Sequence, residues 1–335
     1  MKILVTGGAG YIGSVTVRHL LDSWHQVVVL DTLERGWAEA VDERAQLFVG
    51  NVGDSALLDE ALSGCDAVMH LAGYIEVGES QADPGKYFRN NVSRAQVLLD
   101  GMVRHGVGAI VFSSTAAVYG EPESIPIAES APTRPINAYG ASKLMFEQLL
   151  DWYERLHFVR TMRFRYFNVA GAWPDGSLGE AHNPETHIVP RLLRSMAAGQ
   201  AVFEVYGDSY PTPDGTCVRD YIHVLDLAQA HRLGLERLAE GGEGGIFNLG
   251  SGRGFSNLDV VRTCAEVAGC EVEVRVGPPR AGDPAMLVAS SEKALTNLGW
   301  APERSSLETM LADAWLWHRA HPRGYRTNEA ATKRA

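Results

Sequence analysis

The 335-residue sequence has few cysteines, and none of them forms a Cys-x-x-Cys pair. No histidine cluster accompanies them at the spacing that metal sites use. We therefore expect no metal centre and no disulfide framework. Free thiols in a reducing compartment are predicted instead for Cys65, Cys217, Cys264 and Cys270.

Long apolar runs and an excess of positive charge are also missing. No apolar stretch approaches the ~20 residues of a membrane span. The first residues run straight into glycines rather than into the apolar core of a signal peptide. With 41 acidic and 30 basic side chains the net charge is -11, which argues against nucleic-acid and membrane-surface roles. We expect a cytoplasmic protein without nucleic-acid or membrane partners.

Short apolar runs alternate with helical stretches through the first half of the chain. Strands are expected at 3–5, 27–30, 46–49, 67–73, 109–112 and 163–168, and helices at 14–23, 55–63 and 90–105. This alternation predicts an α/β fold with a Rossmann-like, doubly wound parallel sheet. Its ligands should lie at the carboxyl ends of the strands.

The composition changes after residue 171, where a stretch rich in Gly, Pro and Asp suggests a crossing into a smaller region. Further strands are expected at 201–206, 245–249 and 271–276, and helices at 190–198, 224–238, 257–268 and 306–320. We predict a cofactor-binding domain at 1–170 with returning segments near 215–252. A substrate-binding domain at 171–325 and a polar, poorly ordered tail at 326–335 complete the chain.

A glycine-rich turn follows the first strand. Gly7, Gly10 and Gly13 lie in a pattern that lets backbone approach a pyrophosphate at a helix N-terminus. Asp31 ends the second strand about 20 residues later, where NAD enzymes bind a ribose 2′-hydroxyl. A carboxylate there would repel a 2′-phosphate, so NAD is favoured over NADP. The alternative role for Asp31 is a simple turn or helix cap.

Tyr139 and Lys143 are four residues apart, so a helix places them on the same face. A phenol has a pKa of ~10, and a nearby ammonium group lowers that pKa by favouring the phenolate. The pair is therefore interpreted as a base that takes a proton from an alcohol. Alternatively, Tyr139 packs at a helix end and Lys143 extends into solvent.

The same helix is apolar nearly all round, with Leu144, Met145, Phe146, Leu149, Leu150, Trp152 and Tyr153. A helix of this kind is buried on two sides. One side should face the sheet, and the other a second subunit in a homodimer. A lid formed by the chain's own C-terminal half is the alternative.

Several longer strings identify the chain as similar to the extended short-chain dehydrogenase/reductase family. The resemblance runs to about residue 325 and is closest to the nucleotide-sugar 4-epimerases of that family. It rests on TGGAGYIG, HLAGYIEVGES, SSTAAVYG, NAYGASK, RYFNVAGA, YPTPDGTCVRDYIHV and FNLGSG. It implies an NAD-dependent isomerase that interconverts UDP-glucose and UDP-galactose by oxidation at C4, rotation of the keto sugar and re-reduction.

The resemblance also implies roles for individual residues. Tyr139 would be the base, Thr115 would hydrogen-bond the reacting hydroxyl, and Lys143 would contact the nicotinamide ribose. NAD would further contact Gly7, Gly10, Tyr11, Ile12, Gly13, Asp31, Asn51, Val52, Leu71, Ala72, Gly73, Asn90 and Phe167. The UDP-hexose would contact Asn168, His187, Tyr206, Arg219, Arg280, Asp283 and Leu287.

Some of these substrate contacts have alternatives. Guanidinium groups suit phosphate oxygens, although Arg219 and Arg280 could also be surface charges. His187 and Asp283 match the family less specifically, and Tyr206 could be a core aromatic rather than a stacking partner for uracil. Leu287 has intermediate bulk at a position that governs room for an N-acetyl group, so acetylated UDP-hexoses are a further hypothesis.

The chain departs from the family pattern at two cofactor positions. Asn51 replaces the usual Asp, and Ile75 replaces a frequent lysine, which removes one cationic contact to NAD.

Two other functions are weighed against the epimerase. A dehydratase needs an acidic pair after the Thr, whereas Ala116 and Ala117 follow Thr115; a decarboxylase of this fold is the other enzyme alternative. A non-catalytic NAD sensor would generally lack the Tyr139 and Lys143 pair.

Overall fold

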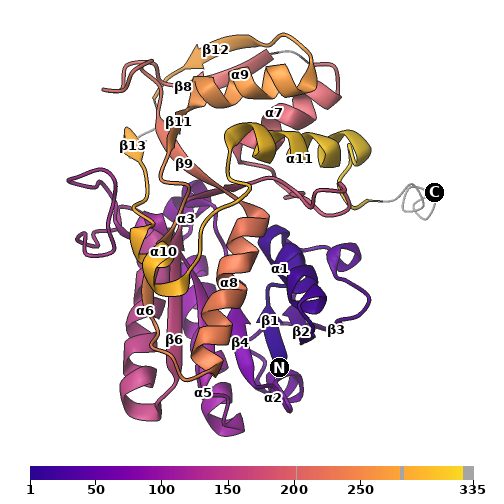
Figure 1. The fold of residues 1–335 in the computed structure, drawn as a ribbon, viewed down its shortest axis with the longest axis vertical. Helices are drawn as coiled ribbons and strands as arrows, with labels where there is room; N and C mark the ends of the chain where they lie inside the picture. The colour runs from indigo at the N-terminus through magenta and orange to yellow at the C-terminus, as the bar shows by residue number, and fades with distance from the viewer. Residues whose placement is uncertain (201, 280–282, 327–335) are drawn as a thin grey trace.

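The computed structural model describes residues 1–200, 202–279 and 283–326. Seven strands of the described chain form one wholly parallel sheet, in the lower part of Figure 1. The sheet order is β10 (Gly245–Leu249), β6 (Arg160–Tyr166), β5 (Ala109–Thr115), β4 (Ala67–His70), β1 (Lys2–Thr6), β2 (Gln26–Asp31) and β3 (Gln46–Val49). The predicted α/β, Rossmann-like fold is confirmed.

The strand order changes direction beside β1. β2 and β3 lie on one side of β1, while β4, β5 and β6 continue on the other. In an open parallel sheet such a switch point leaves a crevice at the carboxyl ends of the strands. Ile3, Leu4 and Val5 are fully buried, as expected for a strand covered on both faces.

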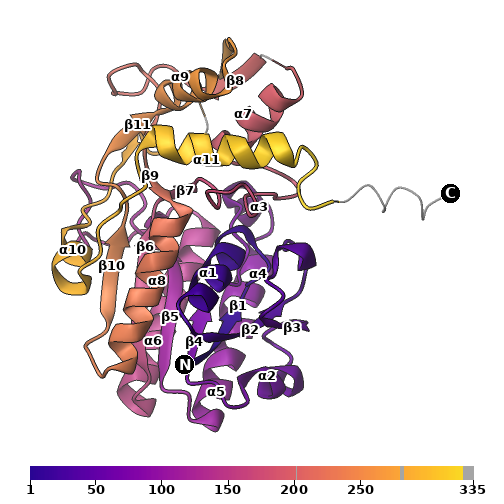
Figure 2. The ribbon, with the colours of Figure 1, turned by 45° about the vertical axis from the view of Figure 1, so that its right-hand side comes forward.

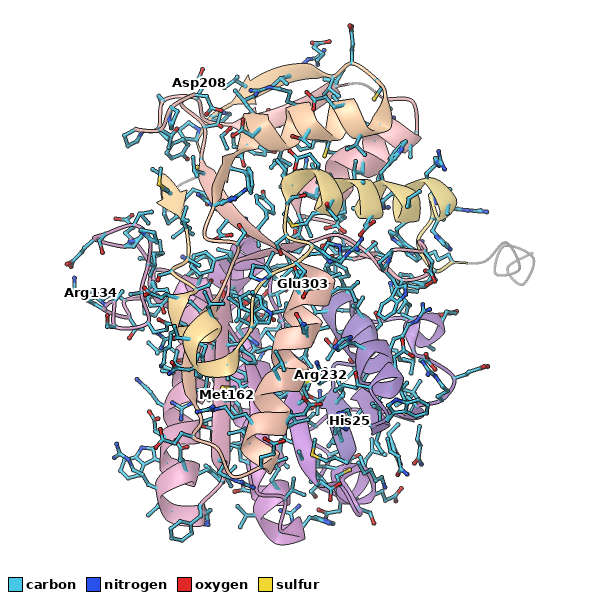
Figure 3. All side chains as sticks on the ribbon, in the orientation of Figure 1. His25, Arg134, Met162, Asp208, Arg232 and Glu303 are labelled. Atoms are coloured by element: carbon cyan, nitrogen blue, oxygen red, sulfur yellow. The ribbon has the colours of Figure 1, made fainter. Side chains whose placement is uncertain are left out.

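Helices cover both faces of the sheet, as Figure 2 shows. One face packs against α1 (Tyr11–Asp22), α8 (Val224–Ala239) and α10 (Glu292–Leu298). The other face packs against α2 (Ser55–Leu62), α5 (Ala95–His105) and α6 (Ala138–His157). Apolar side chains fill the space between each helical layer and the sheet, and together they form the core of the sheet domain (Figure 3).

A second apolar core lies beyond the carboxyl ends of the strands, at the top of Figure 1. It joins α7 (Ile188–Ala197), α9 (Asn257–Ala268) and α11 (Leu307–Ala320) to the parallel pair β8 (Val202–Tyr206) and β12 (Glu273–Gly277). Between the two cores, β9 (Val218–His223) pairs with β7 (Asn168–Ala170), β11 (Gly254–Ser256) and β13 (Met286–Leu287). The predicted domain boundary at residue 170 stays a prediction.

Two expected elements are divided. The strand expected at 163–168 breaks at Phe167, so that β6 and β7 belong to different sheets. The helix expected at 90–105 begins as a π turn, Arg89–Arg94, before α5. Short elements not expected from the sequence are β9, β11, β13, α10, α3 (Val77–Ala82), α4 (Pro84–Phe88) and the 3-10 turns Ala38–Ala40 and Ala116–Val118. Apolar periodicity is weak in such short pieces, which explains their absence from the prediction.

The four cysteines are free; Cys65, Cys217 and Cys264 are buried, whereas Cys270 is exposed. Cys270 follows the left-handed glycine that ends α9, and so lies outside the second core. No helix in the described parts of the chain is long and apolar enough to span a bilayer. The tail predicted to be poorly ordered lies outside the described residues, except for Arg326.

Candidate active site

A cavity of about 1200 Å³ lies between the carboxyl ends of the parallel strands and the second core. Its lining brings together nearly all of the site residues expected from the sequence. These are Gly7, Gly10, Tyr11, Ile12, Gly13, Asp31, Asn51, Val52, Leu71, Ala72, Gly73, Asn90, Thr115, Tyr139, Lys143, Phe167, Asn168, His187, Tyr206, Arg219, Asp283 and Leu287. The remaining one, Arg280, lies outside the described residues.

The glycine turn is built so that no side chain fits inside it. Gly7 has a φ of +76°, and a Cβ at Gly13 would come within 2.0 Å of the Gly7 carbonyl oxygen. α1 begins directly after Gly10, which provides no side-chain cap for the helix. The first backbone N–H groups of α1 therefore have no side-chain acceptor, and the positive end of the helix dipole can attract an anion to the cavity edge.

Asp31 ends β2 beside this turn. Its carboxylate accepts hydrogen bonds from the backbone N–H of Ala9, at 3.0 Å, and of Leu33, at 2.8 Å. Burial raises the pKa of Asp31, while these two hydrogen bonds lower it. The carboxylate is thus fixed at the cavity edge and caps its own turn, while its contact with a ribose stays a prediction.

Two asparagines line the same side of the cavity. Asn51 Oδ1 accepts a hydrogen bond from the Gly53 N–H at 2.9 Å. Asn90 donates to Asn91 at 3.1 Å, and Asn91 in turn bonds the backbone of Tyr74. Asn91 was not expected from the sequence; it is buried and holds the turn after β4 in place.

Helix α6 positions the Tyr139 and Lys143 pair. Asn137 caps the helix by accepting a hydrogen bond from the Gly140 N–H at 2.8 Å, so Tyr139 lies in the first turn. Lys143 lies one turn later and donates from Nζ to the Ser113 carbonyl at 2.9 Å. The ammonium group is therefore tethered to the carboxyl end of β5 instead of extending into solvent.

The pKa values of the pair are governed by burial. Burial lowers the pKa of Lys143 to about 8. Burial and the nearby Tyr166 raise the pKa of Tyr139 well above its ordinary value, while a hydrogen bond with Thr115 acts in the opposite direction. The expected lowering of the Tyr139 pKa by Lys143 is therefore wrong for the chain by itself, because desolvation is the larger effect.

A buried ion pair supports this arrangement from behind. Glu147, on α6, accepts two hydrogen bonds from the Arg165 guanidinium on β6, at 3.0 and 2.5 Å. It also accepts a hydrogen bond from Ser114, which directly precedes Thr115 on β5. Both ionic side chains are almost inaccessible, at 3 and 4 % exposure. The pair fixes α6 against two strands of the sheet.

The opposite wall carries polar groups from β9 and from the segment near β13. Arg219 lies 3.4 Å from Asp283, with 13 % of the arginine side chain exposed. The neighbouring Asp220 is fully buried and accepts hydrogen bonds from the backbone of Ser251 and Ala289. Asp220 was not expected from the sequence, and it ties together the loops around Arg219.

The end of the cavity beside Leu287 is apolar. Phe167 and Leu287 pack against one small buried cluster that includes Val118 and Tyr119. Leu287 also stands opposite Arg219 in the β13–β9 pairing. The β13–β9 pair therefore places the charged Arg219 and the apolar Leu287 side by side in the cavity wall.

Four donors gather at a third part of the wall, between β7 and α7. Glu180 Oε1 lies 3.0 Å from His182 Nδ1 and 2.9 Å from His187 Nδ1. Glu185 lies 3.7 Å from His182 and 3.2 Å from His187. Only His187 was expected from the sequence. The pattern that could have indicated the other three is Glu-x-His-x-x-Glu-x-His, from 180 to 187.

The sequence profile of a family described as the NAD dependent epimerase/dehydratase family matches residues 3–250. The chain belongs to this family. It is 49% identical over 329 residues to the UDP-glucose 4-epimerase of Halalkalibacterium halodurans, and the match covers 98% of each chain.

Solved structures of family members agree. The structure of a UDP-glucose 4-epimerase superposes with a TM-score of 0.95 at 46% identity, covering 98% of this chain and 100% of the other. The Bifidobacterium longum UDP-glucose 4-epimerase, solved in complex with NAD+ and UDP, has a TM-score of 0.91 at 36% identity, covering 97% and 100%. The expected family and its NAD dependence are thereby confirmed.

Proposed function

We propose that the protein interconverts UDP-glucose and UDP-galactose, with NAD as its cofactor. One observation carries the proposal: Tyr139, Lys143 and Thr115 meet at the carboxyl end of β5 in the cavity that also holds the glycine turn. The family and its relatives support the same reaction.

The residues present suit NAD. The glycines of the turn keep the backbone free of Cβ atoms, which would collide with neighbouring backbone. The uncapped start of α1 offers its N–H groups to a diphosphate. Asp31 offers a carboxylate to a ribose hydroxyl, and Asn51 retains a second lone pair on Oδ1 for an adenine amino group. We assign the walls near Val52, Leu71, Gly73, Asn90 and Phe167 to the rest of the cofactor.

Bound NAD would supply the hydride chemistry at C4 of the sugar. Tyr139 takes the proton of the C4 hydroxyl as the hydride leaves, and gives it back when the ketone is reduced. Thr115 holds that hydroxyl by a hydrogen bond. Lys143, whose ammonium group is tethered to the Ser113 carbonyl, would contact the nicotinamide ribose.

The two ends of the substrate need different treatment. The keto sugar must turn over inside the pocket, so the hexose end has to be loosely held while the diphosphate is gripped. We assign the grip to Arg219, with Asn168 and His187 nearby, and uracil stacking to Tyr206. The apolar pocket around Phe167 and Leu287 offers shape to the hexose without binding it in one orientation.

Residues next to Thr115 argue against a dehydratase. Ala116 and Ala117 line the cavity, and neither can donate or accept the proton that expulsion of a hydroxyl requires. A non-catalytic NAD sensor would not need a buried lysine tethered at the carboxyl end of β5.

Incubation of the purified protein with a panel of UDP-hexoses, with and without added NAD, tests the proposal. UDP-galactose should be converted to UDP-glucose with no net change in the amount of NADH. Loss of carbon dioxide or water from the sugar would assign a decarboxylase or dehydratase instead. Reduced-nicotinamide absorbance without product, or no response to any sugar, would contradict the epimerase.

Acetylated UDP-hexoses are a second proposed substrate class, because Leu287 leaves a pocket of intermediate size. Turnover of UDP-N-acetylglucosamine at a rate comparable with UDP-glucose would support this extension. A Leu287→Tyr variant should lose acetylated turnover first and keep UDP-glucose turnover. Absence of any acetylated product from the parent protein would end the extension.

A homodimer is proposed from one stripe on α6. Met145, Leu149, Trp152 and Leu156 follow one another at spacings of three and four, and so share a face. Trp152 is 58% exposed and Leu156 64% exposed. Their helix, α6, lies beside α5 (Figure 1). Trp152→Glu should convert the dimer to a monomer in light scattering. Trp24→Glu, at an exposed position outside the stripe, should leave the mass unchanged.

The cytoplasm is the proposed location. Three buried, unpaired thiols, those of Cys65, Cys217 and Cys264, fit a reducing compartment. Cell fractionation should recover the protein with cytoplasmic markers, and recovery from a secreted fraction would contradict this location.

A further inference from the structure

The four donors between β7 and α7 form a cluster that the proposed reaction does not explain. Their ligand atoms all lie within 4.8 Å of one another. The side chains of Glu180 and Glu185 are 6 and 5 % exposed, that of His182 is 18 % exposed, and only that of His187, at 45 %, reaches the cavity freely. The cluster therefore offers two nitrogen and two carboxylate donors in a mostly dry place.

Two buried polar atoms of this cluster lack a hydrogen bond within the described residues. Glu185 Oε2 and His182 Nδ1 are buried, yet neither makes a hydrogen bond within the described residues. Nδ1 of His182 lies 3.0 Å from Glu180 Oε1, so the two atoms are close without being aligned for a bond. A buried polar atom without a hydrogen bond costs free energy, and coordination of an ion removes that cost.

The spacing of the donors fits one small cation. In tetrahedral zinc sites the Zn–N and Zn–O distances are about 2.0–2.2 Å, which places neighbouring donor atoms about 3.4 Å apart. The four donor contacts in the cluster run from 2.9 to 3.7 Å and bracket that value. His187 Nδ1 meets the geometry of a hydrogen bond with Glu185 Oε1, at 3.2 Å, whereas His182 Nδ1 makes no hydrogen bond within the described residues.

We propose that Glu180, His182, Glu185 and His187 bind one divalent transition-metal ion, zinc by their donor set. Imidazole nitrogens favour zinc and its neighbours, whereas calcium and magnesium require six or more oxygen ligands. Four protein ligands fill a tetrahedral zinc, so the site is closed and structural rather than catalytic.

The ion would tie residues 180–187 together directly before α7, at the edge of the cavity. Nδ1 of His187 is the donor, which leaves Nε2 of the same ring for a substrate contact. A metal ion here would replace the expectation of no metal centre, which rested on the cysteines, and its binding does not depend on which reaction the cavity performs.

Metal content is the direct test. The full-length protein is treated with a chelator, desalted, reloaded with ZnCl₂ and desalted again, and bound metal is measured by mass spectrometry. One zinc per chain is expected, with a thermal midpoint several degrees above that of the metal-free protein, because the ion binds only the folded state. Reloaded protein that holds no zinc and melts at the metal-free temperature would overturn the proposal.

Variants locate the ion. Glu185→Gln and His182→Gln should each weaken zinc binding at least tenfold, because one donor is lost. His105→Gln, which alters a histidine paired with Asp59 on the surface, should keep parental stoichiometry. Parental zinc binding by Glu185→Gln would contradict the assignment.

Cobalt keeps the test decisive if a variant fails to fold. Co²⁺ in the parent protein should give the visible absorption of a tetrahedral site with nitrogen and oxygen ligands. A sulfur-to-cobalt charge-transfer band would place the metal at a cysteine and overturn the proposal. The weak spectrum of octahedral Co²⁺ would do the same.

Discussion

The two walls of the cavity are built in different ways. On the sheet side, Thr115 and Lys143 are 8 and 3 % exposed, and the Glu147–Arg165 pair behind them is buried. On the opposite side, the Asp283 side chain is 37% exposed, and Leu287 belongs to a strand of only two residues. One wall is part of a continuous core, whereas the other consists of short strands and connections.

This difference fits the division of labour that the proposed reaction needs. Proton transfer requires atoms held within hydrogen-bonding distance, which a packed core provides. A substrate that must turn over during the reaction needs a wall that grips only one end. Changes on the sheet side should therefore alter catalysis or stability, and changes on the opposite wall should alter affinity.

Replacement of the proposed base should have the largest effect. Tyr139→Phe should lower kcat by about 10²–10⁴-fold, because proton transfer is lost, while NAD and UDP binding remain. Tyr153→Phe, later on the same helix, removes a hydroxyl bonded to Asp100 and should keep parental kcat. Steady-state kinetics with UDP-galactose measure both. Parental turnover by Tyr139→Phe would contradict the assignment of the base to Tyr139 on the sheet side of the cavity.

Removal of the buried ion pair should destabilise the fold. Glu147→Gln leaves the Arg165 guanidinium buried without its carboxylate, which should lower the free energy of unfolding by about 3–5 kcal/mol. Asp59→Asn breaks an exposed pair with Arg104, which water screens, and should leave the free energy of unfolding nearly unchanged. Urea unfolding compares the two. Equal small losses would show that the sheet side gains no rigidity from this pair.

The buried ammonium group should make stability depend on pH. The pKa of Lys143 falls from 10.5 to about 8 on burial. Between these values the unfolded chain binds the proton more tightly, so stability rises with pH. Relative to Lys143→Met, the parent should gain about 3 kcal/mol across this range.

Urea unfolding of both proteins at several pH values from 7 to 10.5 measures that gain. Lys2→Met, which alters a half-buried lysine whose ammonium group bonds the Ser63 carbonyl, should follow the parent. Identical pH dependence in the parent and Lys143→Met would mean that Lys143 is solvated in solution, contrary to its tether at Ser113.

A substitution on the opposite wall should have the smallest effect, and it should alter affinity and not turnover. Arg219→Lys should weaken UDP binding about tenfold, because an ammonium group loses the two-pronged fit to phosphate oxygens, while kcat changes little. Arg134→Lys, on the loop that projects at the left of Figure 3, is the matched control. Calorimetry with UDP measures affinity. A loss in kcat without a loss of UDP affinity would contradict the assignment of substrate binding to this wall.

Much of the sheet side could be predicted from sequence, because its signals are local. The run Ile3-Leu4-Val5, the glycines after it and Asp31 follow one another along the chain in the order of one strand, turn and helix. Tyr139 and Lys143 are one helical turn apart, so their common face follows from the helical period alone. Even so, the strand expected at 163–168 was divided, since a break at Phe167 depends on which sheet each half joins.

The remaining features depend on distance through space and on burial, and so they follow from the folded chain and not from local patterns. Arg219 meets Asp283 from 64 residues away, and Arg165 meets Glu147 inside the core. The Tyr139 pKa rises rather than falls, because desolvation outweighs its neighbours. The fold class, the glycine turn and the common face of Tyr139 and Lys143 follow from the sequence alone, because each is a periodic or contiguous pattern. Folding determined which charges meet and how strongly water is excluded from them.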